Sequence, residues 1–168
     1  MSWGKTNVQQ AFTFHFILSV VAMLVLNVCD IMMWRAGAIT VEDAQTVTVP
    51  ATTIELLPYH FWVMTVLWLT LNGIIAATYF FYTRDMVGGA VLMSIGMIYS
   101  LLAVQDILFF YYQGRADSMP QNWTWLYWQN SVFGSPLPLF TVLVMACIGV
   151  AAIFGLFAFR LHTFKQSR

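Results

Sequence analysis

Three ionisable residues, Asp30, His60 and Asp106, lie within or at the edge of long apolar segments of the chain. A charged side chain at the centre of a bilayer-spanning helix costs free energy, about 2.5–3.5 kcal/mol on insertion scales, and in membrane proteins such residues commonly have a function. Two carboxyl groups and an imidazole can bind a cation, relay protons, or act as general acid and base on a lipophilic substrate. These three residues are therefore the candidate catalytic residues.

Two other interpretations of the same residues stay open. A metal ion would take Asp30, His60 and Asp106 as ligands. Among the residues expected in the outer half of the membrane, however, only His60 supplies a nitrogen ligand, which makes a metal the weaker hypothesis. Alternatively the groups pair structurally, Asp30 with Arg35 or His60 and Asp106 with Arg115, and hold helices together.

Further polar and small residues recur at helical spacing beside these three. Residues three or four apart share one face of a helix, and each of three apolar segments carries such a stripe. The first stripe comprises His15, Ser19, Met23, Asn27 and Asp30; the second His60, Met64, Trp68 and Asn72; the third Gly96, Ser100, Ala103, Asp106 and Gln113. The pattern predicts a helical bundle with a polar seam. The candidate ligand-binding residues are Asn27, Trp68, Asn72, Gln105 and Gln113.

The amino-acid composition indicates whether these helices face water or lipid. Of 168 residues, 60% are apolar and 8% are charged, and the formal net charge is zero. A soluble domain carries about 25% charged residues. The chain is therefore predicted to be an all-α integral membrane protein whose first partner is the lipid bilayer, and no nucleic-acid partner is expected.

Four segments are long enough to cross the hydrocarbon core, which takes about 20 helical residues. They are residues 11–33, 58–82, 87–112 and 136–159, arranged as one four-helix membrane domain. Pro58 and Pro136 suit helix starts, where a missing N–H is tolerated. Residues 83–86 leave room only for a tight turn between the second and third helices.

The basic residues predict the orientation. Five of the seven would lie on the inner side if the N-terminus is inside: Lys5, Arg84, Arg160, Lys165 and Arg168. Such a bias marks the cytoplasmic side of a membrane. Both termini, including a tail at 160–168, are therefore predicted to be cytoplasmic, in a plasma or cytoplasmic membrane.

Two longer connections would then lie outside. Residues 34–57 contain alternating β-branched residues, which predicts a short β-hairpin. Residues 113–135 contain Trp123, Trp125, Tyr127 and Trp128, and rings at this density favour the headgroup level. Asn122 begins an N-x-T triplet, which matters only in a secretory pathway.

The fourth apolar segment carries small residues at Cys147, Ala151 and Gly155. Small side chains at four-residue spacing let another helix approach closely. The partner helix is either within this bundle or in another subunit, which includes a second copy of the chain.

No signature of a nucleotide-binding, serine-hydrolase or zinc-protease site occurs, so the sequence identifies neither a reaction nor a cofactor. Three hypotheses remain: a polar site in the outer half of the bundle that handles a small lipophilic ligand or substrate, a non-catalytic transmembrane subunit of a larger complex, and a proton or cation pathway. The pathway is disfavoured, because His15 is the one titratable group expected between the level of Asn72 and the inner membrane face. One group leaves no evident proton relay across the membrane.

Overall fold

The computed structural model describes residues 5–33, 51–112, 114, 119, 121–123, 126, 129, 132–133 and 137–166. For residues 5, 6, 30, 33 and 51–65 it describes the backbone alone. The described part is mostly helical. Its elements are α1 (Lys5–Met33), α2 (Ala51–Thr83), α3 (Met86–Leu101), α4 (Val104–Tyr112), β1 (Asn122–Trp123), β2 (Leu137–Pro138) and α6 (Leu139–Gln166).

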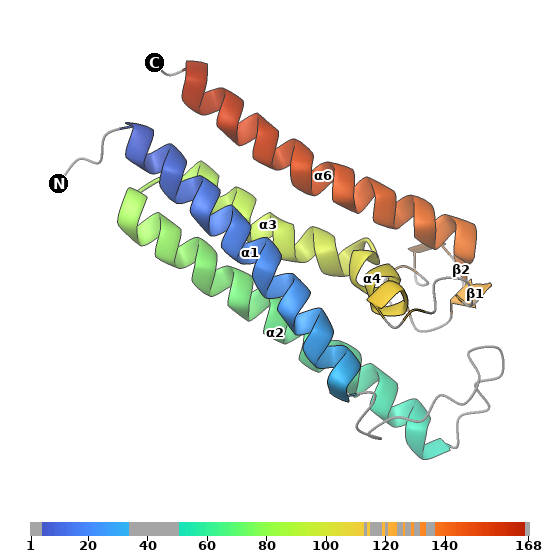
Figure 1. The fold of residues 1–168 in the computed structure, drawn as a ribbon. Helices are drawn as coiled ribbons and strands as arrows, with labels where there is room; N and C mark the ends of the chain where they lie inside the picture. Colours follow the sequence, from blue (N-terminus) through green and yellow to red (C-terminus); the bar gives the residue numbers. More distant parts are fainter. Residues whose placement is uncertain are drawn as a thin grey trace.

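The helices α1, α2, α3 and α6 run alongside one another as an elongated bundle (Figure 1). The first turn of α1 and the last turn of α6 lie at the end of the bundle where α2 turns into α3 (Figure 1). The short helix α4 and the β1–β2 pair lie toward the opposite end. The two strands are antiparallel, with Asn122 opposite Pro138 and Trp123 opposite Leu137.

Three segments are long and apolar enough to cross a membrane: Asn7–Cys29, Val66–Thr83 and Leu139–Gln166, with mean hydropathies of 2.2, 1.4 and 2.7. A fourth exists if α3 and α4, whose axes differ by 64°, are counted as one bent span. The prediction of a mostly helical chain with several potential membrane spans is confirmed. Insertion into a membrane and the orientation of the termini stay predictions.

Several helix limits differ from those expected. The helix α2 begins at Ala51 rather than at Pro58, since a proline can sit inside a helix at the loss of one backbone hydrogen bond. The helix α6 continues to Gln166, so most of the expected tail is helical. Residues 34–50, which include the expected β-hairpin, lie outside the described residues, as does Pro136.

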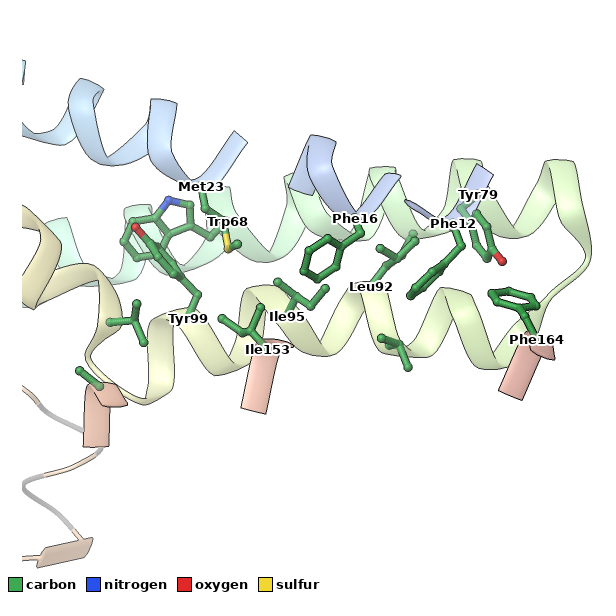
Figure 2. Close-up of a cluster of buried hydrophobic side chains, with 14 residues drawn as sticks. Phe12, Phe16, Met23, Trp68, Tyr79, Leu92, Ile95, Tyr99, Ile153 and Phe164 are labelled. Carbon is green, nitrogen blue, oxygen red and sulfur yellow. The ribbon is translucent and has the colours of Figure 1, made fainter. Parts of the chain in front are cut away.

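The interior of the bundle is filled by aromatic and aliphatic side chains from α1, α2, α3 and α6 (Figure 2). Phe16 stacks on Phe157 with ring centroids 4.1 Å apart, and Trp68 meets Tyr99 edge-on at 5.5 Å. Trp68 is 1% exposed and, with Trp123, is one of the two largest fully buried side chains among the described residues. Packing at this density fixes the helix faces that carry the polar seam.

A second apolar cluster forms beside α4. Trp123 is fully buried there, and its ring lies 5.3 Å from that of Phe110. The ring thus packs against the protein, and its position at the headgroup level stays a prediction. Trp125, Tyr127 and Trp128 lie outside the described residues.

Candidate functional site

The third predicted span is interrupted between α3 and α4. Ala103, which is fully buried, has φ of 56°, a left-handed conformation that residues with a side chain seldom adopt. The Leu102 N–H still donates to the Ile98 carbonyl at 3.0 Å, and the Ile107 N–H donates to the Ala103 carbonyl at 3.2 Å. One helix therefore ends and another begins at this point, and the expected single helix over 87–112 is bent by 64°.

Two tertiary contacts hold this bend. Gly149 of α6 lies so close that a Cβ there would be 2.6 Å from Val104 Cγ2 and 3.0 Å from Leu102 Cβ. Gln129 donates a hydrogen bond from Nε2 to the Leu101 carbonyl at 2.7 Å. That bond satisfies one of the carbonyls at the end of α3, which lack partners within the helix.

Asn27 joins three helices at the bend. Its side chain is fully buried, and Nδ2 donates to the Tyr99 hydroxyl at 3.2 Å and lies 3.5 Å from the Gln105 carbonyl. Asn27 Oδ1 and Ser100 Oγ have no hydrogen-bond partner within the described residues, although both side chains are at most 4% exposed. The same holds for buried atoms of Ser19, Trp68, Asn72, Gln129 and Arg160. A buried polar atom without a partner costs about 1–3 kcal/mol, so Asn27 Oδ1 and Ser100 Oγ favour binding a polar group.

The polar seam continues from the bend toward the middle of the bundle. Asn72 is fully buried, and its Nδ2 donates to the Trp68 carbonyl at 3.0 Å. Its side chain lies over Gly96, where a Cβ would come within 2.7 Å of Nδ2. Ser19 is also fully buried. The structure thus buries Ser19, Asn27, Asn72 and Ser100 of the seam and leaves His15 and Asp106 half-buried. Their binding of a ligand stays a prediction.

Of the three candidate catalytic residues, the structure describes the side chain of Asp106 but not those of Asp30 and His60. Asp106 is half-buried in the first turn of α4, where a carboxylate interacts favourably with the positive end of the helix dipole. Asp30 lies in α1 and His60 in α2, but their side chains fall outside the described residues. Gln105 is half-buried beside Asp106, and Gln113 falls outside the description. The convergence of Asp30, His60 and Asp106 therefore stays a prediction.

Among the side chains that the structure describes, no three His, Cys, Asp or Glu residues lie close enough together to hold a metal ion. The metal hypothesis needs Asp30 and His60, whose side chains are not among those described, so it stays a prediction.

An apolar cavity of about 130 Å³ adjoins the bend. Its wall includes Tyr99 of α3 and two residues of α4, and no polar atom contributes surface to it. The helices α1 and α6 supply the rest of the wall: Val20, Met23, Leu24, Val150, Ile153 and Phe154. Tyr99, which lines this cavity, also accepts the hydrogen bond from Asn27 Nδ2, so Asn27 is linked to the cavity wall through Tyr99.

A second polar cluster, at the α2–α3 turn, was not predicted from the sequence. Asp85 caps α3, accepting a hydrogen bond at Oδ1 from the Gly88 N–H at 3.0 Å. Its Oδ2 accepts from the Tyr79 hydroxyl and lies 2.6 Å from Arg160 Nη2 of α6. Aspartate directly before a helix is an N-cap signal, which could have identified Asp85, but nothing in the sequence pairs it with Arg160.

The charge state of Asp85 follows from these contacts. Burial alone would raise the pKa of the carboxyl, but hydrogen bonds from Arg160, Gly88 and Tyr79 and the charge of Arg160 outweigh burial and hold the pKa below its ordinary value. Asp85 is therefore ionised at neutral pH and ties the α2–α3 turn to α6.

The small-residue stripe of α6 faces away from this bundle. Cys147, Ala151 and Gly155 are exposed, and a Cβ on Gly155 would meet no atom within 4 Å. The described part of the bundle thus packs no helix against the stripe, and its role as a helix-packing interface stays a prediction.

The fold and the site define a class of protein: a helical bundle with three or four potential membrane spans and a bent helix at a buried polar site. Comparison of the chain with protein-family models, curated proteins and solved structures gave no match.

Proposed function

We propose that this chain is a multi-pass membrane protein, with both termini cytoplasmic, that binds a small lipophilic ligand at the α3–α4 bend. The observation that carries the proposal is that Asn27 Oδ1 and Ser100 Oγ, two of the seven buried polar side-chain atoms without a partner in the described residues, belong to the residues around the bend. Interrupted helices in membrane proteins commonly form binding sites, because irregular backbone at that depth is tolerated where it lines a cavity or is buried in protein.

The hydrogen-bonding capacity of Asn27 and Ser100 indicates which polar group the ligand carries. Asn27 Oδ1 is an amide oxygen and can only accept a hydrogen bond. The donor end of the same amide, Nδ2, already faces the Tyr99 hydroxyl and the Gln105 carbonyl. A ligand hydroxyl or N–H group would satisfy it, and Ser100 could donate or accept. Trp68, Asn72 and Gln105 extend the polar surroundings.

If the protein is an enzyme, Asp30, His60 and Asp106 are its candidate acid and base groups. An Asp106→Asn variant is then expected to fold and to lose turnover, because an amide neither takes up nor releases a proton near neutral pH. Binding and turnover of the retained molecule would be measured together. Unchanged turnover would remove Asp106 from any catalytic role.

The binding proposal predicts that Asn27→Leu weakens ligand retention. Leucine has a similar size and cannot accept a hydrogen bond. The substitution also removes the bond from Asn27 to the Tyr99 hydroxyl, at a cost of about 1–3 kcal/mol of stability, so folding of the variant is checked by helical circular dichroism. Losing one hydrogen bond of about 1.4 kcal/mol lowers affinity about tenfold. The measurement is native mass spectrometry of the protein extracted in mild detergent from its own membrane.

Thr13→Val is the matched control, since Thr13 lies on the same helix and its hydroxyl already donates to the Gln9 carbonyl at 3.0 Å. Retention of one small molecule by the wild type and by Thr13→Val, with reduced retention by Asn27→Leu, supports the site. A wild-type protein that carries no small molecule, or equal retention by Asn27→Leu, contradicts it.

A second candidate function, a non-catalytic subunit of a membrane complex, is favoured by the outward-facing stripe of Cys147, Ala151 and Gly155. Its partner would be another transmembrane subunit or a second copy of this chain. Gly155→Leu is expected to remove co-purifying polypeptides while Asp106→Asn keeps them, because the leucine blocks close helix approach. Unchanged co-purification with Gly155→Leu argues against this role.

A further inference from the structure

We infer that the cavity between α1 and α6 takes an apolar group about the size of a six-membered ring, and that the ligand enters it sideways from the bilayer. This inference deepens the proposed function and rests on it for recognition of the polar group. It names the class of ligand, a compact lipid-soluble molecule with a hydrogen-bond donor beside a ring-sized apolar body.

The size and chemistry of the cavity support the apolar body. The volume is about 130 Å³ and no polar surface lines it. An engineered apolar protein cavity of about 150 Å³ stays dry and binds benzene or xenon. Water is therefore a poor occupant here, and a group of about six carbon atoms is a suitable one.

The rim of the cavity indicates the direction of entry. Val150 and Phe154 line the cavity from α6, yet they are 42% and 57% exposed. Both belong to a segment apolar enough to cross a membrane, so their exposed sides would face lipid. The opening between α1 and α6 therefore leads to the hydrocarbon layer rather than to water.

The far end of the bend offers a less direct route. Trp123 and Leu126, at most 2% exposed, form an apolar cluster over α4, and Gln129 binds the carbonyl at the end of α3. A ligand arriving from that end would have to displace these contacts. Lateral entry requires no such rearrangement.

The position of Asn27 limits the length of the ligand. Asn27 follows the cavity-lining Met23 by four residues, about one helical turn or 6 Å along α1. A molecule that fills the cavity and reaches Asn27 Oδ1 therefore carries its donor close to its apolar body. A compact alcohol or phenol fits this description, whereas the terminal segment of a long acyl chain lacks the donor.

The test uses benzene and phenol as probes of the full-length protein in nanodiscs, with isotope-labelled isoleucine methyl groups observed by NMR. Contacts between benzene and Ile153, which lines the cavity, are compared with contacts to Ile148, which is 55% exposed on the same helix. We expect benzene to contact Ile153 in preference to Ile148. Equal contacts, as for dissolution in the surrounding lipid, would overturn the inference.

Two phenylalanine substitutions of α6, one at the rim of the cavity and one outside it, test the route of entry. Val150→Phe places a ring at the opening and is expected to abolish the Ile153 contact, whereas Ile148→Phe, the same enlargement outside the cavity, is expected to preserve it. Persistence of the contact in Val150→Phe would overturn lateral entry. Since Val150 is already exposed, the phenylalanine demands little repacking.

The two probes separate this inference from the proposed function. Benzene needs only the cavity, and phenol adds the hydrogen-bond donor for Asn27. Stronger binding of phenol that is lost in Asn27→Leu supports the complete ligand description. Benzene bound at Ile153 with no preference for phenol would keep the apolar pocket and reject the polar recognition, and with it the compact-alcohol class.

Discussion

Asp85→Asn is expected to lower the free energy of unfolding by about 3 kcal/mol, because Arg160 would keep its charge without its partner. The two side chains are 10% and 14% exposed, with Arg160 Nη2 2.6 Å from Asp85 Oδ2. Asparagine still caps α3, so the loss reports on the ion pair rather than on the cap. Unfolding would be followed by helical circular dichroism in detergent against temperature or denaturant.

Arg84→Gln serves as the control, since Arg84 is the neighbouring cation and is exposed. We expect it to change stability little, as exposed charges contribute about 0–1 kcal/mol. The double variant Asp85→Asn, Arg160→Gln should recover part of the loss, because the unpaired charge is gone. Equal stability of Asp85→Asn and the wild type would show that the pair does not tie the α2–α3 turn to α6.

The same pair gives the protein a defined response to acid. A carboxyl whose pKa is lower in the folded than in the unfolded state stabilises the fold above the unfolded value, and this stabilisation is lost as pH falls through the folded value. The pKa of Asp85 is lowered from 3.8. Wild-type stability should therefore decline below about pH 4, and Asp85→Asn should show a smaller decline over that range.

Gly149→Leu is the second change for which we expect a large effect, a loss of about 3 kcal/mol or failure to fold, because overpacking of a filled interior typically costs about 1–3 kcal/mol and sometimes more. A Cβ at this position would already be 2.6 Å from Val104 Cγ2. The leucine would push α6 away from the α3–α4 bend. Thermal unfolding in detergent measures the effect.

Gly155→Leu is its matched control on the same helix, since a Cβ there meets no atom within 4 Å. We expect this variant to unfold like the wild type. Similar destabilisation by both substitutions would mean that α6 does not pack on the bend through Gly149. A neutral Gly155→Leu also makes its effect on co-purifying subunits interpretable.

Local patterns in the sequence predicted a good part of this architecture. Apolar runs identified the potential membrane spans, and the short segment 83–86 identified the turn between α2 and α3. Helical spacing placed Asn27, Asn72 and Ser100 on stripes, and all three side chains are buried. Such features depend on the chemistry of neighbouring residues, which a single sequence displays.

Features that depend on tertiary contacts were not predicted. The bend falls within Leu101-Leu-Ala-Val104, which contains neither glycine nor proline, and it is held by Gly149 and Gln129 from distant parts of the chain. The direction of the α6 stripe was also beyond the sequence, because small residues occur on both faces of that helix. Gly149 faces the bundle and Gly155 faces outward.

The bend also sets the hydrophobic thickness that this chain would match. A straight helix over residues 86–112 would be about 40 Å long, well beyond the roughly 30 Å of a typical hydrocarbon core. With α3 along the membrane normal, its 16 residues rise about 24 Å, and the nine of α4, tilted by 64°, add about 6 Å. The bent span therefore fits a bilayer of ordinary thickness without the tilting or local thickening that a straight helix of the same sequence would require.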